Sequence, residues 1–270
     1  MRTTVLIVAA GSGSRLQAGV PKALVTLGDG NTMLEHCLDS VVAARDAGVV
    51  ELNAIAVVVP GDPDAAASLE AVCRAFAARS AVPVQTVPGG AERADSVRAG
   101  LAAVRGLAGT AGGPFGRHAL LVHDAARPFV PPAVFGAVVA ALESGTVAVV
   151  PGVEVVDTIK SVARAGAEPG ADDGAAPEEV TGTLQRTQLR AVQTPQGFDL
   201  TSLEAAHRRA EEDAGLTGGA AALTDDAMAM EAAGHRVGVV AGDPLGFKIT
   251  TQLDLILANA LLASTTLEHH

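Results

Sequence analysis

The chain has 270 residues, a length that suits one large α/β domain, and its 30 acidic and 19 basic side chains give a formal net charge of −11. The acidity and the 2% aromatic content argue against nucleic-acid binding, which needs a basic face and, for single strands, stacking rings. The 49% hydrophobic content supplies a sizeable core, and two cysteines are too few for a disulfide scaffold or a cysteine-built zinc site. Two such thiols fit a reducing compartment, so we expect a cytoplasmic protein. We expect no membrane span, because no apolar run approaches the length of about 18 residues that one needs.

Short apolar runs alternate with helical patterns through residue 150. Strands are predicted at 4–9, 54–59, 83–87, 119–123 and 146–150, and helices at 32–47, 64–79, 94–105 and 131–143. Consecutive apolar positions are typical of parallel strands that are covered on both faces. We therefore predict a doubly wound, mostly parallel α/β sheet, a Rossmann-like fold whose ligands bind at the carboxyl ends of the strands.

The pattern changes after Pro151. Residues 153–163 alternate partly like a solvent-facing strand, the acidic stretch 165–180 has no apolar period, and the chain returns through 181–193. Because a two-stranded excursion is rarely stable alone, we expect residues 153–193 to form a projecting arm that packs on something else, such as a second subunit. Regular patterns resume at 200–212, 224–233, 236–240 and 251–263. We predict one domain over 1–264 that includes the arm, and a tail at 265–270 that resembles the start of a purification tag.

Lysine is scarce in this chain. Sixteen of the 19 basic residues are arginine, and the lysines are Lys22, Lys160 and Lys248. Where arginine is the usual cation, a retained lysine indicates either chance or a place that needs a compact ammonium group.

The loop after the first strand, residues 9–16, suits phosphate binding. Its two glycines let backbone N–H groups approach phosphate oxygens closely. Leu16 stands where a dinucleotide fingerprint has its third glycine, and the Gly-Lys-Ser/Thr of a P-loop is absent. Arg15 and Lys22 flank the loop with two positive charges, which favours phosphoryl or nucleotidyl transfer over a plain surface turn.

Two later strand ends also carry informative residues. Gly89-Gly90 lets a planar ring pack on the backbone, with Ser96 in the first turn of the next helix. Asp124 ends the fourth strand, where a carboxylate can hold a divalent cation that bridges phosphates. His123 before it is more typical of a packed strand residue than of a ligand. Arg127 either pairs with Asp124 or reaches a substrate phosphate.

Three segments near the carboxyl end are more ambiguous. Thr194-Pro195-Gln196-Gly197 is typical of a turn, and Thr224-Asp225-Asp226 of a helix N-cap with an acidic first turn. Lys248 falls in what reads as a short apolar strand, where a lone lysine needs a counter-charge that a ligand phosphate would supply.

Together these motifs resemble the 2-C-methyl-D-erythritol 4-phosphate cytidylyltransferases, over nearly the whole chain up to about Leu262. The motifs are residues 10–15 with Pro21-Lys22, 89–97, 122–128, 157–160, 194–196, 224–227 and 247–250. The resemblance implies an enzyme that makes a CDP-alcohol and pyrophosphate from CTP and methylerythritol phosphate, in the non-mevalonate route to isoprenoids. It also implies Mg²⁺ as cofactor and a homodimer in which one subunit's arm reaches the other's site.

The resemblance further implies roles for individual residues. The catalytic residues would be Arg15, Lys22, Arg186 and Lys248. The residues that bind CTP would be Ala9, Ala10, Gly11, Ser12, Gly13, Gly89, Gly90, Arg93, Ser96, Asp124 and Ala125. The residues that bind methylerythritol phosphate would be Arg127, Thr158, Arg186, Thr194, Thr224, Asp226 and Lys248. Asp124 would also bind the metal.

Three other functions compete with this one. The nearest is a related nucleotidyltransferase that acts on another alditol phosphate, such as a pentitol phosphate. A non-catalytic CTP sensor would have no need of Arg15 or Lys22, and both are present. A dehydrogenase is disfavoured by Leu16 and by the Pro60-Gly61 that follows the second strand, where a ribose-binding acid belongs.

Overall fold

The computed structural model describes residues 1–11, 16, 18–90, 93–109, 118–164, 177–217 and 225–267. The strands are β1 (Arg2–Val8), β2 (Glu51–Val59), β3 (Val84–Pro88), β4 (Ala119–Asp124), β5 (Ala148–Glu154), β6 (Lys160–Arg164), β7 (Glu178–Thr183), β8 (Arg190–Val192), β9 (Gln196–Asp199) and β10 (Val237–Ala241). The α-helices are α1 (Met33–Asp46), α2 (Pro63–Ser80), α3 (Arg93–Gly109), α4 (Pro132–Glu143), α5 (Leu200–Thr217), α6 (Asp226–Ala232) and α7 (Gln252–Leu267). Short 3-10 turns are η2 (Lys22–Leu24), η3 (Arg186–Gln188) and η4 (Pro244–Gly246).

The main sheet has the strand order β10-β5-β9-β4-β1-β2-β3, with β8 paired to β5. Strands β1, β2, β3 and β4 run parallel, as do β5 and β10. Strand β9 lies antiparallel between β4 and β5 and joins the two parallel blocks. The predicted doubly wound, mostly parallel α/β fold is therefore confirmed, with one antiparallel strand at its centre.

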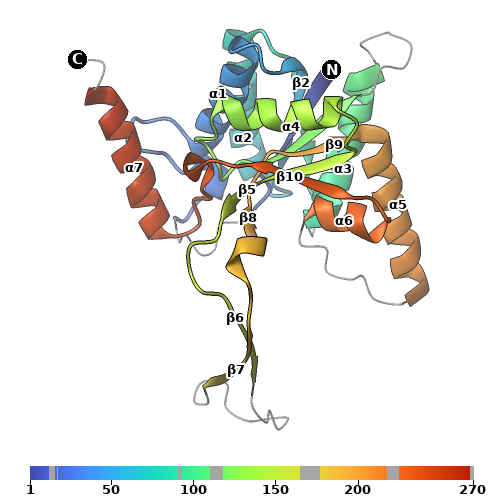
Figure 1. Cartoon of the computed structure of the whole chain (residues 1–270). Coiled ribbons are helices and arrows are strands. Elements are labelled where there is room, and N and C mark those ends of the chain that lie inside the picture. The colour runs from blue at the N-terminus through green and yellow to red at the C-terminus, as the bar shows by residue number, and fades with distance from the viewer. Residues whose placement is uncertain are drawn as a thin grey trace.

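Helices cover both faces of this sheet, which explains why the strands are apolar at consecutive positions. Val5 and Ile7 of β1 pack with α1, α2 and α4 on one face, whereas Leu6 packs with α3, α5 and α6 on the other. A third, smaller cluster joins Leu16, Ile249 and Ala258, and it fixes α7 beside the first loop. Helix α7 stands apart from α5 and α6 in Figure 1.

Two predicted elements are wrong. Residues 194–197 are not a simple turn, because β9 begins at Gln196 and is buried between its neighbours. Lys248 is not in a strand, since residues 247–251 form an irregular segment between η4 and α7. In both places tertiary packing overrides the local pattern.

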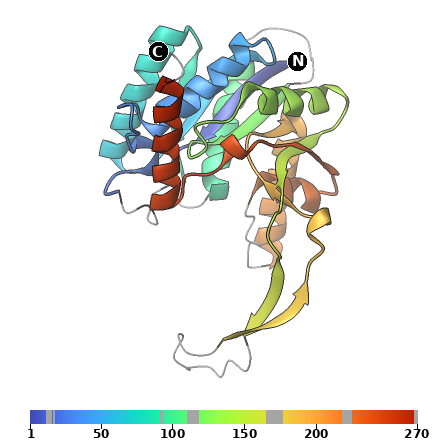
Figure 2. The same cartoon turned by 60° about the vertical axis from the view of Figure 1, so that its left-hand side comes forward.

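Residues between β5 and β9 leave the body of the protein. Strands β6 and β7 pair antiparallel with each other and make a separate two-stranded sheet. Both views show this arm extending away from the main sheet (Figures 1 and 2). The chain then returns through η3 and β8. Of the acidic stretch 165–180, residues 165–176 lie outside the described residues, whereas residues 178–180 belong to β7 and so are not part of an irregular loop.

The remaining sequence predictions concern the cysteines, membrane helices and the tail. Cys37 and Cys73 are both buried and unpaired, and burial raises the pKa of the Cys73 thiol to about 12. Among the described helices none is long and apolar enough to span a membrane. Helix α7 continues to Leu267, so the first part of the expected tail belongs to this helix, and residues 268–270 lie outside the described range.

Candidate active site

The carboxyl ends of four parallel strands meet at one edge of the sheet. Val8 at the end of β1 is paired with Asp124 of β4 and with Val58 of β2, and Val59 is paired with Pro88 of β3. This register brings the loop after β1, the Gly-Gly turn and the Asp124 turn to the same edge. Open α/β sheets bind ligands there.

The Gly89-Gly90 turn packs tightly against the loop after β1. A Cβ atom on Gly89 would lie 2.8 Å from the Ser96 hydroxyl and 3.0 Å from the Ala10 Cβ, and one on Gly90 would overlap Asp95. The Ser96 hydroxyl is buried and accepts a hydrogen bond from the Gly90 amide at 3.2 Å. Both glycines are thus required by close packing, whatever ligand the turn holds.

Backbone contacts place the remaining residues of the predicted CTP site. Ala9 donates its amide to Val58 and Ala125 donates its amide to Val8, and both alanines are buried. Gly11 follows Ala10 at the exposed start of the loop. The predicted residues Ser12, Gly13 and Arg15 lie outside the described residues, as does the side chain of Arg93.

Asp124 and Lys248 form an ion pair at this edge. The Lys248 ammonium donates to Oδ2 of Asp124 at 2.7 Å. The Asp124 side chain is 15% exposed and the Lys248 side chain 44% exposed, so the pair faces solvent on the lysine side. The counter-charge that Lys248 needs is therefore a carboxylate in this structure, where the sequence suggested a ligand phosphate.

Several contacts hold the Lys248 segment against the other loops. The Ile249 amide donates to the Ala126 carbonyl, and the Gln252 side chain donates to the Leu16 carbonyl at 2.7 Å. Asp254 accepts the Thr250 and Thr251 amides at 2.7 Å each, which caps α7. Partial burial favours the neutral acid, but these hydrogen bonds and the charge of Lys22 together lower the pKa of Asp254. Half-buried Lys22, which opens η2, thus belongs to the same charged region.

Arg127 donates hydrogen bonds to the backbone of two other segments. Its guanidinium donates to the Gly246 carbonyl at 2.6 Å and to the Val192 carbonyl at 3.3 Å. Burial lowers its pKa, while the nearby Asp124 carboxylate opposes that shift. Arg127 therefore links the root of the arm to the segment that carries Lys248.

Thr194 bridges the arm root and the Asp124 turn. Its hydroxyl accepts the Asp124 amide at 3.0 Å and lies 2.7 Å from Nδ1 of His123. His123 is fully buried, and this burial lowers the pKa of its imidazole to about 4. The ring is a neutral, packed strand residue, as the sequence indicated. The Thr194 hydroxyl is occupied by these two contacts, which support the strand end.

The two predicted arm residues lie on the segment that leaves the main sheet between β5 and β8. Thr158 is exposed, and Arg186 of η3 donates to the Val156 carbonyl within the arm at 2.7 Å. Lys160, the third lysine, donates to the Thr183 hydroxyl across β6 and β7.

Asp226 is buried where α5 and α6 meet. It is 1% exposed, and its carboxylate lies 3.0 Å from Nε2 of His207 inside the α5–α6 contact. Asp225 is the N-cap of α6 and also accepts from the Gln196 amide group. The structural role that the sequence allowed for this motif is thus present, whereas Thr224 lies outside the described residues.

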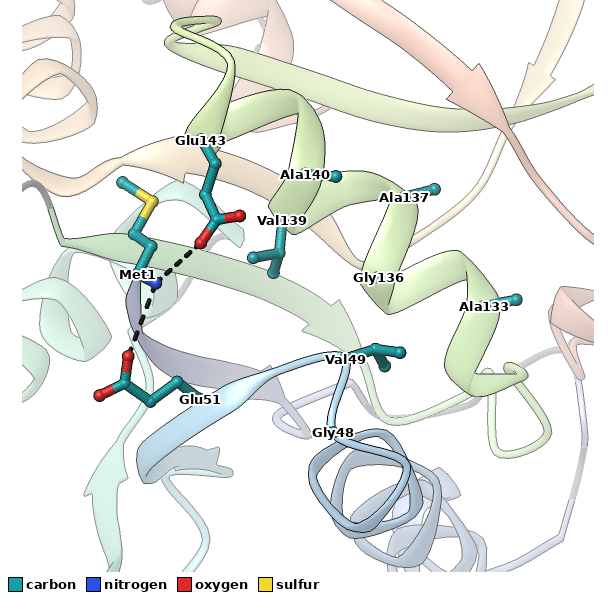
Figure 3. Close-up of a pocket in the computed structure, with 10 residues that line it drawn as sticks. All are labelled: Met1, Gly48, Val49, Glu51, Ala133, Gly136, Ala137, Val139, Ala140 and Glu143. Atoms are coloured by element: carbon teal, nitrogen blue, oxygen red, sulfur yellow. Dashed lines mark hydrogen bonds and ion pairs between the residues drawn. The ribbon is translucent and has the colours of Figure 1, made fainter.

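A cavity of about 560 Å³ lies at the opposite edge of the sheet. Figure 3 shows it beneath α4, with the Met1 amino group between Glu143 at 2.8 Å and Glu51 at 3.5 Å. Met1 and Glu51 stand at the starts of β1 and β2, so this cavity faces the amino ends of the strands. None of the sequence-predicted site residues lines it.

Asp124 fits a Mg²⁺ ion that a substrate helps to hold. In the described part of the chain no three His, Cys, Asp or Glu side chains gather as a metal cluster. Mg²⁺ is commonly bound by one or two carboxylates together with substrate phosphates and water. One partly exposed carboxylate at the ligand-binding edge meets that requirement.

Comparison with known proteins decides the family. The family model described as 2-C-methyl-D-erythritol 4-phosphate cytidylyltransferase matches residues 3–264. The chain belongs to this family. Relatives with that same name are 46% identical in Nocardia farcinica, over 95% of this chain and 92% of theirs, and 41% identical in Streptomyces avermitilis, over 97% and 92%. A crystal structure of the Thermus thermophilus cytidylyltransferase is 32% identical, covers 97% of this chain and 98% of its own, and superposes with a TM-score of 0.64.

The cytidylyltransferase reaction follows from this membership. The enzyme joins CTP and methylerythritol phosphate to give 4-diphosphocytidyl-2-C-methyl-D-erythritol and pyrophosphate, a step of isoprenoid synthesis. The family resemblance inferred from the motifs is confirmed, and no finding favours a pentitol phosphate as substrate.

Two further residues, Asp254 and Gln193, shape the site without a role predicted from the sequence. Asp254 was detectable, because Thr251 and Asp254 have the spacing of a capping box. Gln193, which contacts the Lys248 segment, carries no comparable local signal, since its partner is 50 residues away.

Proposed function

We propose that Lys22 and Lys248, together with Arg15, stabilise charge on the α-phosphate of CTP during cytidylyl transfer. The observation that carries this proposal is the Asp124–Lys248 pair at the carboxyl edge of the sheet. Lys22 supports it, because its charge acts on Asp254 at the start of the helix that follows Lys248. The backbone of residues 9–11 and of Gly89-Gly90, with Ala125, would form the CTP-binding edge.

The reaction needs no general base. A phosphate oxygen of methylerythritol phosphate attacks the α-phosphorus of CTP, a new P–O bond forms, and the bond to the bridging oxygen of the β-phosphate breaks to release pyrophosphate. The nucleophile is already anionic at neutral pH. Catalysis therefore consists of bringing two polyanions together and neutralising the charge that builds on the α-phosphate, which fixed cations do well.

We propose that Mg²⁺ is the cofactor and that Asp124 holds it. The metal would neutralise phosphate charge. Lys248, which contacts Oδ2 of Asp124, would be available to a phosphate oxygen when that carboxylate holds the metal. Thr194 keeps the Asp124 backbone in place, because its hydroxyl accepts the Asp124 amide.

A comparison of CTP with UTP tests whether the enzyme transfers a cytidylyl group. We expect pyrophosphate release with CTP and methylerythritol phosphate, and a much lower rate with UTP, since a site that hydrogen-bonds the cytosine amino group rejects the analogue without it. A panel of alditol phosphates in the same assay compares substrates. Equal rates with CTP and UTP would refute the cytidylyl assignment.

We further propose a cytoplasmic homodimer in which residues 153–193 reach the partner's active site. The arm supports this, because exposed Thr158 and Arg186 flank a separate two-stranded sheet, on the segment that leaves the main sheet after β5. The cytoplasmic location rests on two buried, unpaired thiols. Arg127, Thr158 and Arg186 would then bind methylerythritol phosphate between the subunits.

Subunit mixing tests the crossing of the arm. Lys22→Ala and Arg186→Ala homodimers should each be nearly inactive. After exchange, half of the dimers are mixed and one of their two sites carries neither change, so activity should recover to roughly a quarter of wild type. No recovery, with exchange verified by native mass spectrometry, would show that Arg186 does not serve the partner's site.

A further inference from the structure

Gln193 holds the backbone of Asp243 at two points. This residue lies between β8 and β9 at the root of the arm and is 5% exposed. Its side-chain Nε2 donates to the Asp243 carbonyl at 2.8 Å, and its Oε1 accepts the Asp243 amide at 3.1 Å. The backbone N–H of Gln193 donates to the Pro151 carbonyl of β5 at 2.8 Å. One buried side chain thus fixes both polar groups of a residue to the main sheet.

Two glycines in the segment after β10 leave room for the side-chain amide of Gln193. A Cβ atom on Gly242 would overlap Oε1 of Gln193, and one on Gly246 would lie 3.0 Å from it. Gly242 still donates its amide to the Gly152 carbonyl of β5 at 3.0 Å, and the backbone groups that follow need partners other than a neighbouring strand. Gln193 supplies them for Asp243, and two glycines make room for it.

Arg127 holds the same segment from a second direction. Its guanidinium spans the carbonyls of Gly246 and Val192, and Val192 is the residue before Gln193. Lys248 follows Gly246 by two positions. The arm root therefore fixes the short stretch of backbone that aims the Lys248 ammonium at Asp124.

We propose that Gln193 is a positioning residue for cytidylyl transfer, acting through the placement of Lys248. The inference rests on the catalytic role proposed above for Lys248. If the proposal is correct, loss of the Gln193 side-chain amide lowers the reaction rate only in an enzyme that has Lys248. A purely structural role for Gln193 has a different consequence, since a general loosening of the site would also slow an enzyme that lacks Lys248.

A double-mutant cycle separates these two roles. Gln193→Met keeps the volume and removes both hydrogen bonds. In the otherwise wild-type enzyme we expect kcat to fall roughly tenfold, as small misplacement of a charge stabiliser does, while both KM values change less than about twofold. In a Lys248→Ala background, measured by single turnover, the same change should lower the rate less than about twofold. Gln85→Met, on exposed edge strand β3, is the matched control and should leave both rates unchanged.

A second variant guards against a folding defect. Gln193→Glu keeps the shape and one acceptor but cannot donate to the Asp243 carbonyl, and we expect the same dependence on Lys248. Circular dichroism confirms that each variant is folded. An equal fold-loss with and without Lys248, or an unchanged kcat in folded Gln193→Met, would overturn the proposal. The rate of Lys248→Ala alone tests the catalytic role of Lys248. An unchanged rate in that variant would refute the role of Lys248 independently of the result for Gln193.

Discussion

Removing Lys248 should tighten metal binding to the enzyme without nucleotide. The Lys248 ammonium lies 2.7 Å from Oδ2 of Asp124, the carboxylate proposed above to hold the metal. A lysine that serves catalysis would thus compete with the metal before substrate arrives. Lys248→Ala should lose turnover and gain metal affinity at the same time, a combination that a merely damaged site does not produce.

The size of the effect follows from the geometry. A metal about 2.1 Å from this oxygen would lie at most ~4.8 Å from the ammonium nitrogen, and a double and a unit charge at that distance repel by about 1.7 kcal/mol even in bulk water. Lys248 is 44% exposed and can swing away, at the loss of an ion pair worth about 0.2–1 kcal/mol. Because release is the cheaper alternative, the net competition is at most about 1 kcal/mol, so the Kd for the metal should fall up to about fivefold.

Mn²⁺ is a suitable probe, because electron paramagnetic resonance distinguishes the free ion from the bound one. Lys248→Arg keeps the charge and should bind Mn²⁺ as weakly as wild type does. Asp124→Asn should abolish the gain when combined with Lys248→Ala. Lys160→Ala, which removes a lysine that contacts Thr183 in the arm, should change nothing. If Lys248→Ala binds Mn²⁺ no more tightly than wild type, the competition between ammonium and metal is refuted.

Three further outcomes are expected. Lys22→Ala should lower turnover about 100-fold with little change in urea stability, because it removes one charge stabiliser from a half-buried turn; turnover within a few-fold of wild type would remove Lys22 from the machinery. Asp124→Asn should shift the Mg²⁺ dependence of turnover to much higher concentration, since an amide is a poor ligand for a hard dication, and an unshifted curve would place the metal elsewhere. Burial lowers the pKa of His123 to about 4, so between about pH 6.5 and pH 4 the unfolded chain binds the additional proton and folding stability falls with pH, by about 3 kcal/mol in total; an NMR titration of His123 with a midpoint near 6.5 would contradict this.

Much of the fold could be predicted because its strands are buried on both faces. Val5, Leu6 and Ile7 each pack on a helix layer, so the apolar run is continuous and visible in the sequence. Strand β9 gave no such signal. Its four residues follow Thr194-Pro195, which is a pattern typical of turns, and only the gap between β4 and β5 makes them a strand.

The site was predictable where residues adjoin a strand end and not where a partner lies far along the chain. Asp124 follows directly from its place at the end of β4. Arg127 contacts Val192 and Gly246, which are 65 and 119 residues away along the chain. No local sequence pattern indicates these contacts. Gln193 and Asp243 are 50 residues apart, so their contact is likewise not indicated by a local sequence pattern.

Lys248 and the arginines Arg127 and Arg186 contact different kinds of partner. Arg127 and Arg186 donate to backbone carbonyls, which are fixed partners that a planar, forked guanidinium holds firmly. Lys248 instead holds a single carboxylate oxygen with a compact charge on a flexible stem, and it faces solvent. An ammonium can leave Asp124 and meet a phosphate oxygen without breaking a two-point contact. In the mechanism proposed above, Lys248 is a cation that changes partners during the reaction. Lys160, which donates to the Thr183 hydroxyl in the arm, has no such role, so scarcity by itself does not mark a reacting lysine.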